Sequence, residues 1–422
     1  MKNSLHVLII GYVWPEPNSS AAGYRMLQLI QCFLKNEWQV SFATPAQPTD
    51  HMTNLKSLKV SCHNIQVNDD TFDAFIKEKS ADIVVFDRFM MEEQFGWRVE
   101  KHSPDSLRVL NTEDLHSLRE ARHKAVKHNT DFQITDMYSD SGVREIASIH
   151  RSDLTLMVSE HETELLQQHF QVPQTHLMHL PFMTSPLSTM QKSTRKQFED
   201  RQHLVWIGNF RHAPNWDAVL QLKQTYWPII RKKLKENNLN NVELHIYGAY
   251  PPPKATQLNN EKEKFLVKGW AEDASEVMQN TRLCVAPIRF GAGIKGKLYD
   301  AMLAGTPSIT TSIGAEAMNG PFPWNGVITD DAEEFASATV SLYKDKTSWT
   351  LMQENGDRII EERYDINTWE VAFINRLKRQ LNLKEALRHS HFTGKMLRHH
   401  SMKSTQYMSQ WITLKNGLTN KV

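Results

Sequence analysis

The stretch RFGAGIKGKLYDAMLAGTP, from Arg289 to Pro307, is the part of the sequence that decides the fold. It lies between two short runs, LCVAPI (Leu283 to Ile288) and SITT (Ser308 to Thr311), which are typical of strands buried on both faces. The segment between them predicts a glycine-rich turn and then a helix that begins near Lys297. Strand, turn, helix and strand in this order indicate a doubly wound α/β sheet.

The turn inside this stretch has the composition of an anion-binding site. Gly291, Gly293 and Gly296 allow the backbone to bend tightly and to come close to a ligand. The start of the following helix adds unpaired N–H groups and the positive end of the helix dipole. Lys295 and Lys297 place two cations at the same spot, so we expect a ligand with more than one negative charge. A diphosphate is the first candidate.

Two other interpretations of the turn stay open at this point. GAGIKG fits the pattern G-x-G-x-x-G, and Glu316 follows about 20 residues later, as in NAD-dependent dehydrogenases. Against that interpretation, lysines crowd a turn that small residues would keep bare, and several strands precede the turn in its domain. Glycines and lysines are also common in ordinary exposed connections, which would bind nothing.

The composition bounds the size of the protein and its partners. A chain of 422 residues exceeds what one hydrophobic core usually serves, so we expect two domains. Lys and Arg number 49 and Asp and Glu number 48, which leaves no overall field toward nucleic acid, so we expect no nucleic-acid partner. The three cysteines lack the spacing of a disulfide framework or a zinc site, and the N-terminus enters a strand directly. We therefore expect a cytoplasmic protein.

Strands and helices alternate over most of the chain. The linker is expected from about residue 170 to 202, where prolines and charged residues replace the alternation. We expect a Rossmann-like domain over residues 1–190, a second Rossmann-like domain over 200–365, and C-terminal helices over 366–422 that pack back on the first domain. Apolar runs predict strands at 6–10, 38–43, 82–86, 107–110, 154–158, 204–208, 243–248 and 265–268.

Several motifs of the second half follow one another in a specific order. They are WIGNFRHAPNWDAV (Trp206 to Val219), HIYG, VKGWAED and VAPIRFGAGIKGKLYDAMLAGTPSITTSIGAEAM. Together they resemble the C-terminal half of family-4, or group 1, glycosyltransferases. In the first half, GYR (Gly23 to Arg25) and VSEHETELL (Val158 to Leu166) are similar to the same family. The resemblance implies the GT-B architecture, in which two Rossmann-like domains face each other across a cleft.

The resemblance also implies which residues bind a nucleotide-sugar donor. In the family, two acidic residues eight positions apart flank the glycine-rich turn, and the second one binds the ribose. Here the second is Asp300, while Ala292 replaces the first, as in a GxGxKxK variant whose lysines take over diphosphate contacts. Arg211 stands where the family places a basic residue against the diphosphate. The expected donor site consists of Arg211, Gly291, Gly293, Lys295, Lys297, Asp300 and Glu316.

The first domain contributes two further candidates. His116 resembles the family's histidine that faces the donor sugar, and we expect it to be the catalytic residue, with a helix-surface histidine as the alternative. Asp87 and Arg88 directly follow an expected strand, where open α/β sheets bind ligands. A local ion pair is the alternative for these two residues.

The resemblance implies a retaining glycosyltransferase that moves a sugar from a nucleotide-sugar to a glycan or lipid-linked acceptor, in cell-surface polysaccharide synthesis. The sequence contains no D-x-D pair, so we expect neither a metal nor another cofactor. Ala292 leaves open a catalytically inactive protein that binds glycan or nucleotide. Tyr407, Trp411 and their basic neighbours are compatible with weak contact at the inner face of a membrane, although docking on the protein itself is the favoured alternative.

Overall fold

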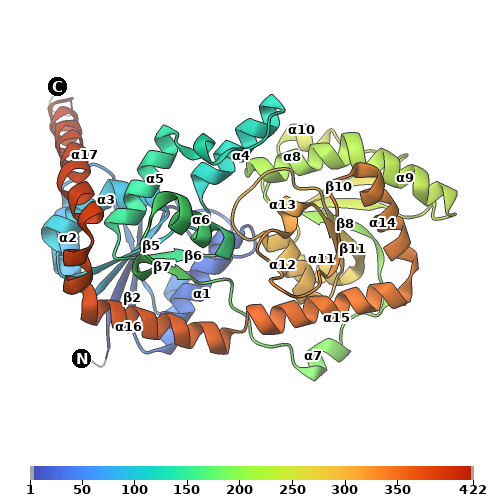
Figure 1. Cartoon of the computed structure of the whole chain (residues 1–422), viewed down its shortest axis with the longest axis horizontal. Helices are drawn as coiled ribbons and strands as arrows, with labels where there is room; N and C mark the ends of the chain where they lie inside the picture. Colours follow the sequence, from blue (N-terminus) through green and yellow to red (C-terminus); the bar gives the residue numbers. More distant parts are fainter. Residues whose placement is uncertain (1–3, 420–422) are drawn as a thin grey trace.

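Two parallel sheets with helices on both faces make up the computed structural model, which describes residues 4–419 (Figure 1). The first sheet has seven strands in the order β3-β2-β1-β4-β5-β6-β7, and the second has six in the order β10-β9-β8-β11-β12-β13. Neighbouring strands are parallel throughout both sheets. The expected α/β class with two doubly wound sheets is confirmed.

The first sheet contains β1 (His6–Ile10), β2 (Gln39–Thr44), β3 (Ser61–Asn64), β4 (Ile83–Asp87), β5 (Leu107–Asn111), β6 (Leu154–Met157) and β7 (Leu177–His179). Its helices are α1 (Ala21–Lys35), α2 (Thr71–Lys79), α3 (Phe89–His102), α4 (His116–His128), α5 (Asp140–Arg151) and α6 (Glu160–Phe170). Three short 3-10 helices connect them, η1 (Leu55–Leu58), η2 (Ile134–Met137) and η3 (Gln174–His176).

The second sheet contains β8 (Gln202–Ile207), β9 (Leu244–Tyr247), β10 (Phe265–Gly269), β11 (Thr281–Ala286), β12 (Ser308–Thr310) and β13 (Gly326–Ile328). Its helices are α8 (Ala213–Gln221), the π-helical η5 (Leu222–Tyr226), α9 (Trp227–Glu236), α10 (Pro253–Thr256), α11 (Ala274–Asn280), α12 (Gly296–Leu303), α13 (Ser312–Ala315), α14 (Ala332–Lys344) and α15 (Lys346–Arg363). The connection between the sheets carries α7 (Thr189–Ser193) and η4 (Phe198–Asp200), and the chain ends with α16 (Ile366–Ser390) and α17 (Phe392–Thr419).

Burial on both faces explains why the central strands are almost uniformly apolar. Val7, Leu8, Ile9 and Ile10 of β1 have no exposed surface. Because side chains alternate along a strand, Val7 and Ile9 join the cluster that contains α1 and α16, while Leu8 and Ile10 join the cluster under α2 to α6. The second sheet has a hydrophobic core of its own.

The C-terminal helices return to the first domain, as Figure 1 shows for α16 and α17. Phe373, Ile374 and Leu377 of α16 are part of the core on one face of the first sheet. Asp153, which is 5% exposed, anchors the end of α16, because its carboxylate accepts hydrogen bonds from Arg388 at 2.6 and 2.7 Å. Helix α17 then packs on α3 and α5. No helix within residues 4–419 is long and apolar enough to cross a membrane.

Three short edge elements were not expected from the sequence. β3, β7 and β13 have three or four residues each, which is too short for a hydrophobic period to stand out. β7 lies inside the segment from residue 170 that was interpreted as a linker. The first sheet therefore extends further along the chain than the end of the strand–helix alternation suggested. The connection between the domains begins only after Pro181 to Thr184, where Thr184 pairs with Asp365 on the returning chain.

Each sheet has a point where the strand order reverses. In the first sheet this point lies between β1 and β4, and in the second between β8 and β11. Open α/β sheets bind ligands beyond the carboxyl ends of such strands, because the following loops diverge and leave a crevice. The loops that follow these four strands line the same cavity.

Candidate functional site

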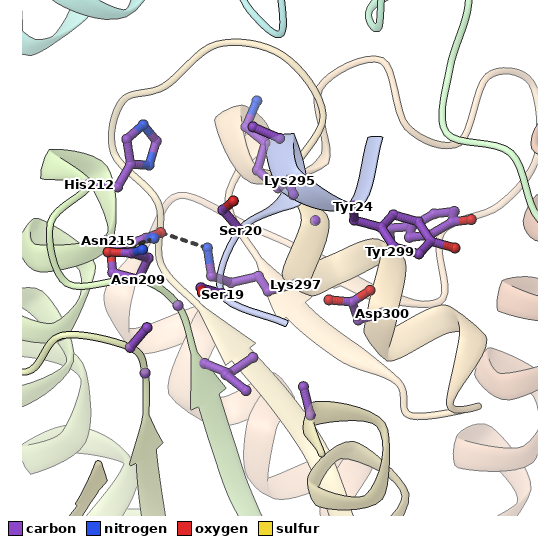
Figure 2. Close-up of a pocket in the computed structure, with 18 of the residues that line it drawn as sticks. Ser19, Ser20, Tyr24, Asn209, His212, Asn215, Lys295, Lys297, Tyr299 and Asp300 are labelled. Atoms are coloured by element: carbon purple, nitrogen blue, oxygen red, sulfur yellow. Dashed lines mark hydrogen bonds between the residues drawn. The ribbon is translucent and has the colours of Figure 1, made fainter. Parts of the chain in front are cut away.

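A cavity of about 810 Å³ lies between the two domains. The loops after β1, β4 and β5 form its wall on the first domain, and the loops after β8, β9, β10 and β11 form its wall on the second. Figure 2 shows part of this wall around Lys295, Lys297 and Asp300. The cavity is lined by these seven of the expected site residues: His116, Arg211, Gly291, Gly293, Lys295, Lys297 and Asp300.

The glycine-rich loop touches the first domain so closely that two of its glycines accept no side chain. A Cβ atom on Gly293, whose φ is +62°, would lie 2.9 Å from Cβ of Asp114. A Cβ atom on Gly296 would lie 2.8 Å from Cβ of Ala21 at the start of α1. These glycines therefore permit a closed arrangement of the two domains, in addition to the approach of a ligand that we expected from the sequence.

The two lysines of the loop are directed to different partners. Lys295 donates a hydrogen bond from Nζ to the carbonyl oxygen of Gly293 at 2.9 Å and is 7% exposed. Lys297 donates from Nζ to Oδ1 of Asn215 at 2.8 Å, the contact marked in Figure 2. Burial lowers the pKa of Lys297 to about 8. Both cations are thus desolvated beside the cavity, where a diphosphate would stabilise their charge.

Asp300 lies one turn into α12, on the cavity side of the helix. Burial raises the pKa of Asp300 to about 7, while the positive charge of Lys297 opposes this rise. Tyr24 and Tyr299 lie close by in Figure 2, and their rings are 6.3 Å apart. A carboxyl group in this position can accept hydrogen bonds from hydroxyl groups of a ligand.

Ala292 and Glu316 both face the first domain. Ala292 packs against the apolar cluster below α4 and α6, so this position contributes packing where the family has an acid. The carboxylate of Glu316 forms a two-pronged ion pair with Arg122 of α4, at 2.7 and 2.8 Å. Arg122 also donates to the carbonyl oxygen of Gly291 at 2.9 Å. Glu316 does not line the cavity of about 810 Å³, and its role in donor binding stays a prediction.

His116 is the first residue of α4 and reaches the cavity from the first domain. The buried carboxylate of Glu145 accepts the backbone N–H groups of His116 and Ser117, both at 2.9 Å, and so caps the helix. Nε2 of His116 lies 3.4 Å from Oδ1 of Asp114. Burial lowers the pKa of His116 to about 4 despite this carboxylate, so the imidazole is neutral at pH 7. The neutral ring can donate a hydrogen bond to a sugar hydroxyl group or accept one from it.

Arg211 lies at the rim of the cavity, where the two domains meet a second time. Its guanidinium group is 3.6 Å from the ring centroid of Tyr250. The hydroxyl group of Tyr250 donates to the carboxylate of Glu16, in the loop after β1, at 3.0 Å. Nearby, the rings of His51 and Trp270 stack at 4.2 Å. The arginine is thus held on an aromatic surface that itself bridges both domains.

The residues that join the domains at the site were not predicted from any sequence pattern. Oε1 of Glu162 accepts a hydrogen bond from the backbone N–H of Gly293 at 2.6 Å. The ring of His123 stacks on Phe290 at 4.3 Å with an interplanar angle of 7°. Asn215, the partner of Lys297, was also missed. Glu162 and Asn215 lie within motifs that carry the family resemblance, but no local pattern shows that they face another domain or a lysine.

Comparisons with known proteins agree with this geometry. Residues 201–345 match the family model described as "Glycosyl transferases group 1". No curated protein matches the sequence at a significant level. The group 1 resemblance expected from the sequence is confirmed, and the alternative of a dehydrogenase is wrong.

Solved structures share the fold over most of the chain. Sucrose-phosphate synthase from Thermosynechococcus elongatus superimposes with a TM-score of 0.63 at 15% identity, over 90% of this chain and 100% of that chain. HepE of Anabaena, solved with UDP and glucose, gives 0.64 at 12% identity, over 89% and 99%. WaaG, a glycosyltransferase involved in lipopolysaccharide biosynthesis, gives 0.56 at 15% identity, over 85% and 95%. At these identities the likeness shows the GT-B fold.

Replacing the partly buried cation Lys297 should stabilise the protein. A pKa lowered from 10.5 to about 8 means that the fold disfavours protonated Lys297 by about 3 kcal/mol. The hydrogen bond from Lys297 to Asn215 offsets about 1 kcal/mol of this cost. We expect Lys297→Met to raise the free energy of unfolding by about 2 kcal/mol below pH 8. The gain should shrink as the pH rises from 8 toward 10.5, because the folded parent then loses the proton that the unfolded chain still binds.

Urea unfolding at pH 7 and pH 10 measures this difference. Lys262→Met is the matched control, because Lys262 is exposed and lies outside the cavity. A destabilised Lys297→Met variant, or a gain that does not depend on pH, would contradict the assignment of Lys297 as a desolvated cation.

Proposed function

We propose that this chain, whose second domain belongs to the group 1 glycosyltransferases, transfers a sugar from a nucleotide-sugar to a hydroxyl group of a glycan or lipid-linked acceptor, with retention of anomeric configuration. The observation that carries the proposal is the cavity between the two strand-order reversals, which combines buried lysines from the second domain with His116 from the first. The likeness to HepE solved with UDP, and to WaaG, supports a uridine nucleotide and a role in cell-surface polysaccharide synthesis as first candidates.

In this proposal the diphosphate binds at the N-terminus of α12. Nζ of Lys295 and Lys297 would exchange their present partners, the carbonyl oxygen of Gly293 and Oδ1 of Asn215, for phosphate oxygens. Asp300 accepts the ribose hydroxyls, and Arg211 lies at the rim beside the same loop. As the nucleoside diphosphate leaves, its charge develops next to fixed cations and helix N–H groups, which lowers the barrier without reorganisation.

His116 acts on the sugar in this proposal. The neutral imidazole is held by a capped helix on the first domain, so it meets the donor sugar only while the domains are closed. A hydrogen bond made in this closed, reacting state stabilises the transition state more than the bound nucleotide. Glu316 is proposed as a donor-site residue through Arg122 and the loop carbonyl of Gly291 that Arg122 binds.

No metal takes part in the proposed reaction, because the cations of the protein meet the charge of the diphosphate. Within residues 4–419, His203, Glu243 and His245 are close enough to hold a metal ion. These three residues do not line the cavity, and Glu243 already pairs with Lys264 at 3.2 Å. They have no part in the transfer.

One set of experiments tests both the identity of the donor and the proposal that transfer needs no metal. In EDTA, a thermal-shift screen with UDP-, GDP-, ADP- and dTDP-sugars should single out one nucleotide, with a stabilisation of about 2.7 kcal/mol at a hundred times its dissociation constant. Transfer or slow hydrolysis of that sugar-nucleotide should also proceed in EDTA. Activity that disappears in EDTA and returns with magnesium or manganese would contradict the metal-free proposal. Binding without any turnover would indicate an inactive, nucleotide-binding protein.

His116→Ala should lower the transfer rate about a hundredfold or more and leave the affinity for the free nucleoside diphosphate nearly unchanged. The reason is that His116 belongs to the first domain, whereas the nucleotide contacts belong to the second. Steady-state transfer and calorimetric UDP binding measured on the same preparation decide this. His128→Ala is a control on the same helix, since His128 is exposed and does not line the cavity. An unchanged rate in His116→Ala would leave His116 without a catalytic role.

The exposed side of α17 supports weak contact with the inner face of a membrane. Its residues from Phe392 to Thr419 include no Asp or Glu, and basic residues recur along it. Several large side chains on the side away from α3 and α5 are exposed, namely Phe392, Met396, Tyr407, Met408, Trp411 and Leu414. A helix that combines apolar and basic residues in this way binds anionic lipid surfaces. Such contact would bring the cleft near a lipid-linked acceptor.

We expect the protein to sediment with vesicles that contain phosphatidylglycerol and much less with pure phosphatidylcholine vesicles. Lys403→Gln should weaken binding to anionic vesicles about fivefold, and Trp411→Ser should weaken it further. Leu351→Ser, at a residue of α15 that is 52% exposed, serves as the control. Equal sedimentation with both kinds of vesicle, or no effect of Trp411→Ser, would contradict membrane contact through α17.

A further inference from the structure

Arg88, one of the residues that line the cavity, has a backbone conformation that is rare outside glycine. It follows β4 directly, and its φ of 71° and ψ of 157° lie in a region that only glycine adopts easily. The backbone N–H of Arg88 donates to the carbonyl oxygen of Asn111 at 2.7 Å, which holds this conformation in place. Strain of this kind persists where the surrounding structure needs the side chain in one place.

The position of Arg88 is that of a ligand-binding residue. It stands at the carboxyl end of β4, at the point where the strand order of the first sheet reverses between β1 and β4. Its side chain lines the cavity on the first domain, whereas Lys295 and Lys297 line it on the second. The ring of Tyr12, in the loop after β1, lies 4.9 Å from the guanidinium group and supports it.

The guanidinium group of Arg88 has no hydrogen-bond partner in the part of the chain that the structure describes. Within residues 4–419 the guanidinium group forms neither a hydrogen bond nor an ion pair, and its one described contact is with Tyr12. The expected ion pair with Asp87 is therefore absent. One carboxylate oxygen of Asp87 accepts the backbone N–H of Tyr12 at 3.2 Å, and the other is buried without a partner.

Two neighbouring carboxyl groups, Asp87 and Glu113, feel the charge of Arg88 without accepting a hydrogen bond from its guanidinium group. Burial and the negative charge of Asp87 raise the pKa of Glu113 to about 8, so this carboxyl group is uncharged at pH 7. Behind it, the fully buried Arg25 donates to Oδ1 of Asn111 at 2.9 Å and lies close enough to favour the ionised form of Asp87. Arg88 and Arg25 both favour the ionised form of Asp87, so two guanidinium groups share this one carboxylate and the cluster keeps an excess of positive charge.

We propose that Arg88 binds an anionic group, a phosphate or a carboxylate, on the acceptor substrate. The inference rests on the proposed glycosyl transfer, in which the diphosphate of the donor is bound by the second domain. A guanidinium group binds both kinds of anion through two parallel hydrogen bonds. A neutral acceptor would leave a strained arginine without a partner inside the closed cleft, which is unfavourable. The acceptor therefore carries a phosphate or a carboxylate group.

Calorimetry on the protein saturated with UDP tests this inference with three probes of the same shape. Glucose 6-phosphate, glucuronate and glucose differ only at the sixth carbon. We expect at least one of the two anions to bind ten or more times as tightly as glucose. Binding of only one anion identifies phosphate or carboxylate as the group, and binding of both means that charge alone decides. Equal affinity for glucose, or no binding of either anion, would overturn the proposal.

Variants of Arg88 separate its role from that of the donor site. Arg88→Gln should lose at least tenfold in affinity for the anion and leave UDP affinity unchanged, while Arg379→Gln, at an exposed residue of α16, should change neither. Arg88→Gly should lose the same anion affinity yet raise the melting temperature by roughly 2–4 °C, because glycine relieves the backbone strain. A residue with only a structural role would not show these opposite changes.

Two outcomes separate the failure of this inference from that of the proposed function. If Arg88→Gln weakens UDP binding as much as anion binding, Arg88 belongs to the donor site and the inference is wrong, although the function stands. If no nucleotide binds the parent protein, the proposed function fails. The anion titrations are then run on the unloaded protein, and equal affinities of parent and Arg88→Gln would overturn the inference as well.

Discussion

The hydrogen bond from the backbone N–H of Gly293 to the carboxylate of Glu162 joins the two domains at the site. It requires that the glycine-rich loop approach the first domain without a side chain, and Gly293 meets this requirement, because a Cβ atom there would collide with Asp114. With the loop in place, Lys295, Lys297 and Asp300 line one wall of the cavity and His116 lines the other. Burial raises the pKa of Glu162 to about 8 even though it accepts this bond. Closing the cleft therefore brings ionisable groups together in a poorly hydrated space, which is unfavourable until a charged ligand fills it.

The two lysines of the loop show how groups of the protein itself satisfy the hydrogen-bond donors of the site. Lys295 and Lys297 bind the neutral oxygens of Gly293 and Asn215. A neutral oxygen satisfies the donor without neutralising the charge, so each ammonium group gains more from a phosphate than from its present partner. The site is thus prepared for exchange of partners. The guanidinium group of Arg88 differs from the two lysines, because within residues 4–419 it has no hydrogen-bond partner that a ligand would have to replace.

Much of the fold and the donor loop could be predicted from the sequence, because both depend on local patterns. Apolar runs such as residues 6–10 and the glycine-rich turn after residue 288 act within a few residues, and the structure has β1 and α12 there. The contacts across the cleft could not be predicted, since Glu162 and Gly293 are 131 residues apart and no local period links them. Edge strands such as β7 were missed because three residues are too few for a pattern. The lack of a hydrogen-bond partner for Arg88 within residues 4–419 could not be predicted either, because the adjacent Asp87 suggested an ion pair.

The return of α16 to the first sheet has a consequence for the order in which the protein forms. The residues of β8 to α15 lie, in sequence, between two parts of the first domain's core, because Phe373, Ile374 and Leu377 pack against strands of residues 6–179. A ribosome therefore completes the second domain while one face of the first sheet still lacks its cover. Helix α1 covers only part of that apolar face, and the nascent first domain exposes the rest until α16 has emerged. Synthesis of the last helices closes the molecule, and the second domain is a finished folding unit before the first.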